Sequence, residues 1–142
     1  MADSGLVKPR IQQLSNPTVG VRCQATSALG NLGDTAAIPA LVGCLRDTAP
    51  SVRAAAVEAL AKLGATSAAS RITSALSDPV SMVRRAAVVA AGKLGDPSAR
   101  PELTKRLTDP EASVREAAVR VLAGLADKNT VGDLRTLLGD NS

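Results

Sequence analysis

The feature that most constrains this chain is a repeat of 31 residues. The period is marked by four Val-Arg pairs, Val21-Arg22, Val52-Arg53, Val83-Arg84 and Val114-Arg115. The same spacing relates the polar turn residues Asn16, Asp47, Asp78 and Asp109, and the leucines Leu32, Leu63, Leu94 and Leu125. A fixed period of this length predicts a solenoid, in which each repeat is one supersecondary unit that packs against its neighbours.

Each repeat is expected to hold two helices. In residues 16–46, Asn16 is a favourable N-cap and Pro17 a favourable first helical residue. Apolar residues then follow at the spacing of one helix face as far as Leu32. Gly33-Asp34 should end this helix, because glycine accepts the left-handed conformation and aspartate can cap the helix that follows.

The turn between the two helices recurs with one exception. Aspartate follows the first helix at Asp34, Asp96 and Asp127, and we interpret all three as caps. The second repeat has Ala65 at this position, so its turn should be the weakest of the four.

These patterns predict an all-α fold of nine helices in a single solenoid domain, residues 1–142. Residues 1–15 match the second half of a repeat and should act as an N-terminal cap, followed by repeats at residues 16–46, 47–77, 78–108 and 109–142. Hydrophobic residues make up 45% of the chain and aromatic residues 0%. The core should therefore be a strip of Ala, Val, Leu and Ile shared between repeats.

The motif formed by Asp-Pro, Val-Arg, Ala-Ala and Leu-Gly-Asp resembles the HEAT repeats, and most closely the short HEAT-like repeats of the phycobilisome-lyase type. The resemblance implies a right-handed α-α superhelix, with the first helices on the convex side and the second helices on the concave side. It also implies that one arginine per repeat bonds carboxylates or carbonyls of the turns and so forms a structural ladder. These arginines are Arg22, Arg53, Arg84 and Arg115.

The residues that catalysis would need are missing. The chain has no His, which a diiron relative would need as a ligand, and no aromatic side chain on which a glycosylase relative would stack its substrate. Cys23 and Cys44 have no recognisable base to activate them and do not form a CxxC pair. They occupy positions that tolerate charge in other repeats, so we expect inert surface or half-buried thiols. We predict no enzyme activity, no metal and no cofactor.

Partner binding is instead expected on the second helices, where the repeats differ. The side chains expected to point inward are those of Ile38, Leu41, Val42 and Leu45 and their equivalents. The positions between them, Cys44 included, should point outward. The candidate contact residues for a protein partner are Arg71, Ser74, Glu102, Lys105, Arg106 and Asp133. The predicted function is a non-enzymatic scaffold that binds an acidic peptide or a helix on this concave face.

Two other functions stay open. The resemblance allows an accessory or chaperone-like subunit of a bilin-lyase-type enzyme. Binding to a nucleic-acid backbone is a weaker alternative, because the net charge of +4 is mild and no aromatic stacking platform accompanies it.

A second surface is expected on the first helix of the third repeat. Met82 and Val89 lie two turns apart, with Arg85 between them, where other repeats carry polar or small residues. Such a pair could form a secondary contact. Residues 78–108 carry six basic and three acidic side chains and residues 109–142 carry four and six, which permits weak self-association beside a monomer.

Two isolated thiols are typical of a reducing compartment. The first ten residues, MADSGLVKPR, contain no apolar run of a signal peptide, and no segment has the roughly 18 apolar residues of a membrane span. We therefore expect a cytoplasmic protein without a membrane partner.

Overall fold

The computed structural model describes the backbone of residues 4–129 and the side chains of residues 5–125. Eight α-helices lie in this part of the chain: α1 (Ser4–Gln13), α2 (Val19–Leu32), α3 (Ile38–Cys44), α4 (Pro50–Lys62), α5 (Ala69–Ala75), α6 (Ser81–Leu94), α7 (Arg100–Lys105) and α8 (Ala112–Asn129). Short 3-10 segments precede α3, α5 and α7 at Thr35–Ala37, Thr66–Ala68 and Pro97–Ala99, and a fourth, Arg106–Thr108, follows α7. The predicted all-α solenoid is confirmed, while the expected ninth helix falls outside the described residues.

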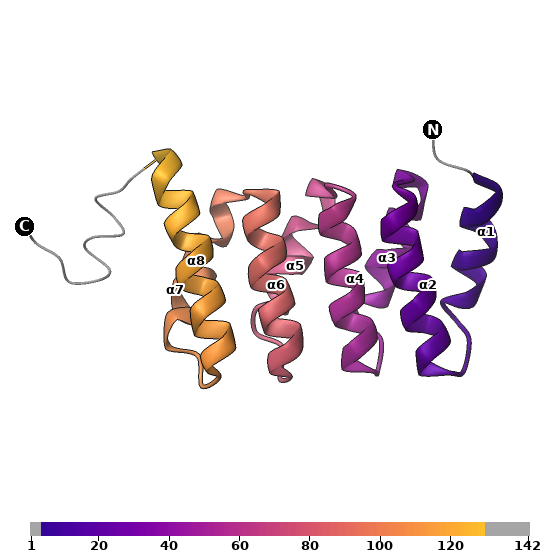
Figure 1. Ribbon diagram of the computed structural model, residues 1–142, viewed down its shortest axis with the longest axis horizontal. Coiled ribbons are helices and arrows are strands. Elements are labelled where there is room, and N and C mark those ends of the chain that lie inside the picture. Colours follow the sequence, from indigo (N-terminus) through magenta and orange to yellow (C-terminus); the bar gives the residue numbers. More distant parts are fainter. Residues whose placement is uncertain (1–3, 130–142) are drawn as a thin grey trace, which may run out of the picture.

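The helices form two layers. The long helices α2, α4, α6 and α8 stand side by side in one row after α1, and the short helices α3, α5 and α7 lie behind them (Figure 1). Each long helix packs on the next one, and each short helix packs on the long helix that follows it. The structure therefore offers two broad faces, the long-helix face and the short-helix face, and two ends, at α1 and at α8.

The core is a strip between the two layers. Its largest fully buried aliphatic side chains come from both layers and include Leu29, Leu41, Leu60, Ile72, Leu76 and Leu103. One continuous cluster connects them from Val7 of α1 to Leu122 of α8. Burial of these residues along the whole row agrees with the shared core expected for a solenoid.

Small residues allow the long helices to approach closely. A Cβ atom added to Gly30 of α2 would lie 2.9 Å from both the Cα and the Cβ of Ala59 on α4. At Gly92 of α6 it would lie 2.9 Å from two methyl groups of Val121 on α8. Close packing of this kind accounts for a core that is filled without aromatic residues.

The turns after the first three long helices follow the expected chemistry. Gly33, Gly64 and Gly95 adopt left-handed φ angles of 72°, 64° and 65°. The Asp34 carboxylate then accepts a hydrogen bond of 2.9 Å from the Ala36 N–H, and the Asp96 carboxylate one of 3.0 Å from the Ser98 N–H. Ala65 provides no such bond, so the carboxylate is lost at that turn.

The starts of the long helices differ from the prediction. α2 begins at Val19, two residues after Pro17, and its N-cap is Thr18. The Asn16 side chain instead accepts a hydrogen bond of 2.9 Å from the Thr18 N–H and closes a turn before the helix. This local bond competes with helix formation, so Asn16 acts as a turn residue.

The end of α8 corrects a second prediction. Ala126 occupies the position of Gly33, Gly64 and Gly95, and α8 continues through it to Asn129. Alanine favours the right-handed helix and disfavours the left-handed stop. Asp127 therefore lies within the 18-residue helix α8, whereas Asp34 and Asp96 lie in turns after a helix has ended.

Candidate partner-binding surfaces

A row of ion pairs connects successive repeats at the N-terminal ends of the long helices. In each pair an arginine holds an aspartate 25 residues later with two bonds, from Nε and from Nη2. The two distances are 2.9 and 3.1 Å for Arg22–Asp47, 3.0 and 3.1 Å for Arg53–Asp78, and 2.8 and 3.0 Å for Arg84–Asp109. Such bidentate pairs specify geometry as well as attraction, so they hold each repeat in register with the next.

The same arginines also satisfy turn carbonyls of their own repeat. Arg53 Nη1 donates to the carbonyls of Asp47 and Thr48 at 2.9 and 3.3 Å, and Arg22 and Arg84 make the equivalent bonds. Their side chains are only 11–16% exposed. The contacts support a structural interpretation of these arginines, because the guanidinium donors are occupied within the fold.

Asp109 is the most buried carboxylate of the row. Its side chain is 0% exposed and contacts Arg84 as well as Arg106, whose Nη1 lies 3.1 Å from Oδ2. The hydrogen bond from Arg84 is the largest influence and holds the pKa of the Asp109 carboxyl below its usual value, although burial acts in the opposite direction. Asp109 is therefore ionised in the folded chain at neutral pH.

The short-helix face contains a groove between α3 and α5. Two of the predicted contact residues, Arg71 and Ser74, line it together with Arg46 of the preceding repeat. Apolar side chains that include Val42, Leu45 and Ala75 also line the groove, which has a volume of about 270 Å³. It combines apolar contact with two exposed cationic side chains.

The other predicted contact residues do not join this groove. Lys105 Nζ lies 3.0 Å from Glu102 Oε1, so these two side chains pair with each other on α7. Arg106 is folded onto Asp109 with a side chain that is 19% exposed, and its buried Nε has no hydrogen-bond partner in the part of the chain described. Asp133 lies outside the described residues.

The repeat units also match a known family. A model of HEAT repeats matches residues 7–79 and, in a second overlapping register, residues 50–123. The chain belongs to the HEAT-repeat family. None of the curated proteins compared with the sequence matches it significantly.

Several solved structures are similar in architecture to this HEAT-repeat chain. The complex of CpcE and CpcF of phycocyanin lyase from Nostoc sp. PCC7120 contains a chain with 26% identity and a TM-score of 0.76, over 97% of this chain and 89% of that one. Human deoxyhypusine hydroxylase is 26% identical with a TM-score of 0.70, over 89% of this chain but only 44% of the hydroxylase. An engineered protein with 19% identity and a TM-score of 0.70, covering 94% of this chain and 68% of its own, shows the fold alone.

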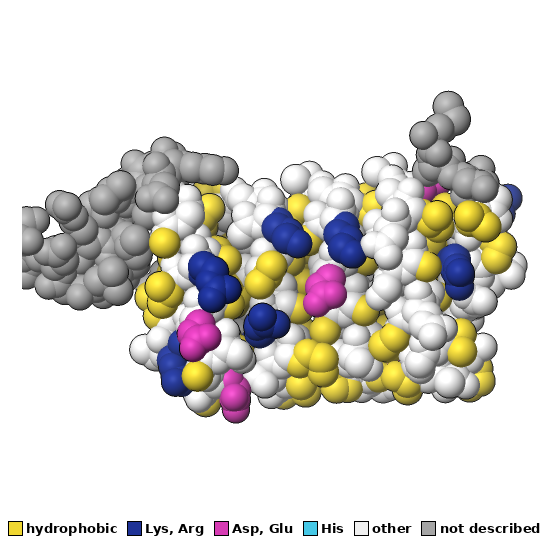
Figure 2. Space-filling model, viewed as in Figure 1, with side chains coloured by type: hydrophobic (Ala, Val, Ile, Leu, Met, Phe, Trp, Pro, Cys, Tyr) yellow, Lys and Arg dark blue, Asp and Glu magenta, His cyan; other side chains and the backbone are white. Residues whose placement is uncertain are grey.

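The long-helix face of this HEAT-repeat chain carries a second, larger pair of grooves on the two sides of α6. Arg85 and Val89 line both grooves, of about 500 Å³ toward α4 and about 520 Å³ toward α8. Met82 and Val89 are 48% and 38% exposed, as their sequence positions predict. Figure 2 shows basic side chains gathered over this part of the face, with fewer acidic ones among them.

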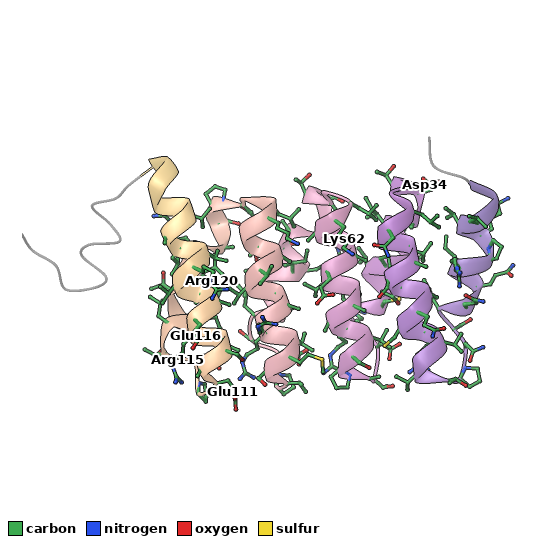
Figure 3. All side chains as sticks on the ribbon, in the orientation of Figure 1. Asp34, Lys62, Glu111, Arg115, Glu116 and Arg120 are labelled. Carbon is green, nitrogen blue, oxygen red and sulfur yellow. The ribbon has the colours of Figure 1, made fainter. Side chains whose placement is uncertain are left out.

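The outer end of the HEAT-repeat row differs from its interior. Arg115 keeps the carbonyl bonds of the other arginines, to Asp109 at 2.7 Å and to Pro110 at 3.0 Å. Within residues 5–125, however, no carboxylate contacts its Nε or Nη2. Arg115 projects from the outer side of α8 (Figure 3), and Val119, one turn further along, is 43% exposed. Sequence reasoning missed this surface, because the residue types match the buried positions of the other repeats.

The thiols are placed differently from each other. Cys23 is half-buried with its Sγ atom 3.4 Å from Ser51 Oγ, whereas Cys44 is 7% exposed. The expectation that Cys44 faces outward is therefore wrong, because α3 turns this position onto Val52 and Ala56 of α4. Burial raises the pKa of the Cys44 thiol, which opposes a role as nucleophile.

Two other kinds of feature are absent from the described residues. No group of three or more Cys, Asp or Glu side chains is arranged to hold a metal ion there. Of the helices described, none combines the length and the apolar character that crossing a membrane requires.

Proposed function

We propose that this HEAT-repeat chain is a non-enzymatic scaffold that binds a protein partner on its short-helix face, in the groove between α3 and α5. The observation that carries the proposal is the composition of that groove: apolar side chains of Val42, Leu45 and Ala75 lie beside the exposed cations Arg46 and Arg71. The scaffold would work in a reducing compartment, because its two thiols are unpaired.

The charges in the groove specify the partner's chemistry. Arg53 and Asp78 also line it, but they are paired with each other, which leaves Arg46 and Arg71 to attract a ligand. An acidic segment with one or two apolar side chains complements such a surface. The absence of aromatic anchors favours modest affinity, since tight interfaces usually depend on Trp, Tyr or Arg hot spots.

A matched pair of variants tests this assignment. Arg46→Glu with Arg71→Glu reverses two charges in the short-helix groove, and Arg85→Glu with Arg120→Glu reverses two on the long-helix face. Proteins captured by the tagged full-length chain from its native cells are identified, purified and titrated against both variants. We expect affinity for the scaffold's partner to fall in the first variant by at least about tenfold, as expected when charges that face a partner are reversed.

The control variant decides between the two faces. The proposal requires that Arg85→Glu with Arg120→Glu binds within about twofold of the parent chain, because it carries the same change in net charge. If both variants weaken binding equally, the effect is one of net charge. Loss in the control variant alone would place the partner on the long-helix face.

A second candidate function is that of an accessory subunit in a bilin-lyase-type enzyme. It is favoured by the similarity to a chain of the CpcE–CpcF complex over nearly the full length of both chains. Mixing this chain with purified CpcE and, separately, with purified CpcF tests it, because an accessory subunit of that type should co-elute with one of them in size-exclusion chromatography. Separate elution from both at micromolar concentrations would exclude this accessory role.

A further inference from the structure

The outer surface of α8 has three counterparts inside the solenoid. On each of the first three long helices, one line of side chains faces the next repeat: Arg22, Thr26 and Gly30 on α2; Arg53, Val57 and Ala61 on α4; and Arg84, Val88 and Gly92 on α6. The same sequence positions on α8 are the stripe of Arg115, Val119 and Ala123. We call this last stripe the α8 end face. The first three stripes are covered by the next long helix.

The α8 end face is more exposed to solvent at its central position than the three equivalent stripes inside the solenoid. Thr26, Val57 and Val88 are all 0% exposed, whereas Val119 at the same position is 43% exposed. The difference arises from the neighbour, since Val57 and Val88 have α6 and α8 against them and Val119 has no further long helix in the part of the chain described. Val119 is apolar and exposed at a position that a following long helix buries in the other three repeats. This surface is therefore suited to packing against another helix.

The guanidinium of Arg115 is oriented by the same kind of backbone bonds as the other three arginines. Its bonds to the carbonyls of Asp109 and Pro110 match those that orient Arg22, Arg53 and Arg84. In those three residues Nε and Nη2 donate hydrogen bonds to the aspartate on the turn before the next long helix. Arg115 is held in the same orientation, and no carboxylate of residues 5–125 contacts its Nε or Nη2.

We propose that the α8 end face docks a helical repeat of a different protein, which places a carboxylate from the turn before its first long helix on Arg115 and packs that helix over Val119. The complement of this face occurs three times within the chain itself, as the turns of Asp47, Asp78 and Asp109 with the helices that follow them. The surface is separate from the α3–α5 groove, so the inference does not depend on the function proposed above.

A second copy of this chain is a poor occupant. Its turn carboxylates Asp47, Asp78 and Asp109 are already bonded to arginines within the copy. At its first turn stands Asn16, which is uncharged and uses its side-chain oxygen to bond the Thr18 N–H. The helix α1 also packs on α2 and covers the equivalent end.

Asp140 of the same chain is the rival source of a carboxylate. It follows Arg115 by 25 residues, the interval of the three observed pairs. The turn that would set this register differs, however, because Ala126 replaces the left-handed glycine and α8 continues to Asn129. The experiment therefore includes Asp140.

Photo-crosslinking from Val119 tests the proposal in the full-length chain. Benzoylphenylalanine replaces Val119, and in a control chain it replaces Leu6, which is 51% exposed at the opposite end. Both chains are irradiated in a lysate of the native cells, and crosslinked peptides are sequenced. We expect the Val119 probe to join a different protein at the first long helix of a helical repeat, just after a turn that contains Asp or Glu, while the Leu6 probe does not.

Three substitutions in the Val119-probe chain then separate the possible sources of the carboxylate. Arg115→Ala should reduce the yield of that crosslink by at least about tenfold, as expected when one member of a buried charge pair is removed. Arg120→Ala removes another exposed arginine of α8 and should leave the yield within about twofold, as should Asp140→Ala. The proposal would be overturned by crosslinks to residues 130–142, to a second copy or to a protein without helical repeats. It would also be overturned if no crosslink forms, or if Asp140→Ala abolishes the crosslink.

Discussion

Asp109 Oδ2 lies 2.8 Å from Arg84 Nε, and the same oxygen accepts a second bond from Arg106 at 3.1 Å. This is the only carboxylate among those described in residues 5–125 that pairs with two arginines. The contact joins α6 to the turn before α8, so it connects the third repeat to the fourth.

The first prediction concerns acid stability. The pKa of Asp109 is depressed in the folded chain. Ionisation of its carboxyl therefore stabilises the fold at pH values above the pKa of the unfolded chain, about 3.9. This contribution is lost as the pH falls toward the pKa of the folded chain. Asp109→Asn should lower the free energy of unfolding at pH 7 and flatten its decline below pH 4. Urea titrations between pH 7 and pH 2.5 measure this, and parallel curves for both chains would contradict it.

The second prediction compares two arginines. Arg53 is 16% exposed and bonds Asp78 and two carbonyls, so Arg53→Ala leaves a largely buried carboxylate unpaired and should cost about 3–5 kcal/mol. Arg71 is exposed in the short-helix groove, and Arg71→Ala should change stability by less than about 0.5 kcal/mol. Equal losses in chemical denaturation would show that the arginine row is not what holds the repeats in register.

The third prediction concerns close helix packing. Gly30→Ala places a methyl group 2.9 Å from the backbone of Ala59, and such overpacking should cost about 1–3 kcal/mol. Gly43 lies within α3 with no atom within 4 Å of an added Cβ. Gly43→Ala should therefore stabilise the chain by about 0.5–1 kcal/mol through lower backbone entropy in the unfolded state. Thermal unfolding of both variants checks the opposite signs.

The fourth prediction concerns the end of α8. Ala126→Gly restores the residue that stops α2 and α6 in the left-handed conformation. We expect α8 to end near Leu125, with loss of helical Cα chemical shifts at residues 127–129 in NMR spectra. Unchanged shifts would mean that Ala126 is not the reason why α8 extends.

The fifth prediction concerns thiol reactivity. Cys44 is buried and its thiol pKa is raised by that burial, so less thiolate is present near pH 8 and alkylation should be slow until the chain unfolds. Cys23 is half-buried and should react first. Rates for the single-cysteine chains Cys44→Ala and Cys23→Ser, measured with and without urea, separate the two sites. Equal rates in the folded state would contradict the difference.

Several features could be predicted from the sequence because they repeat. The 31-residue period requires the same contacts at each step, so the solenoid, the two helices per repeat and the glycine turns at Gly33 and Gly95 follow from pattern alone. The exposed positions of Met82 and Val89 were also predictable, since other repeats carry polar or small residues there. The period was misleading where one residue departs from it, as at Ala126, where a single methyl group favours continued helix over the turn.

The candidate surfaces were predicted less well, because they depend on which side chains meet. Arg106 and Arg71 are both cations in the second halves of neighbouring repeats, yet Arg106 turns onto Asp109 and Arg71 stays exposed in a groove. Cys44 occupies a position that tolerates charge in another repeat but is buried here against Val52 and Ala56. Such differences follow from three-dimensional neighbours that the residue type does not identify.

The sequence by itself determined the architecture of this protein, since a periodic pattern of small aliphatic residues can bury its apolar faces only by stacking one repeat on the next. Only the tertiary structure decided which of the repeated side chains remain exposed at the surface. Arg22, Arg53, Arg84 and Arg115 are equivalent in sequence, and the first three are enclosed by a following repeat. Arg115 and Val119 stand at the end of the described row, where Val119 remains exposed and no carboxylate of residues 5–125 contacts Nε or Nη2 of Arg115.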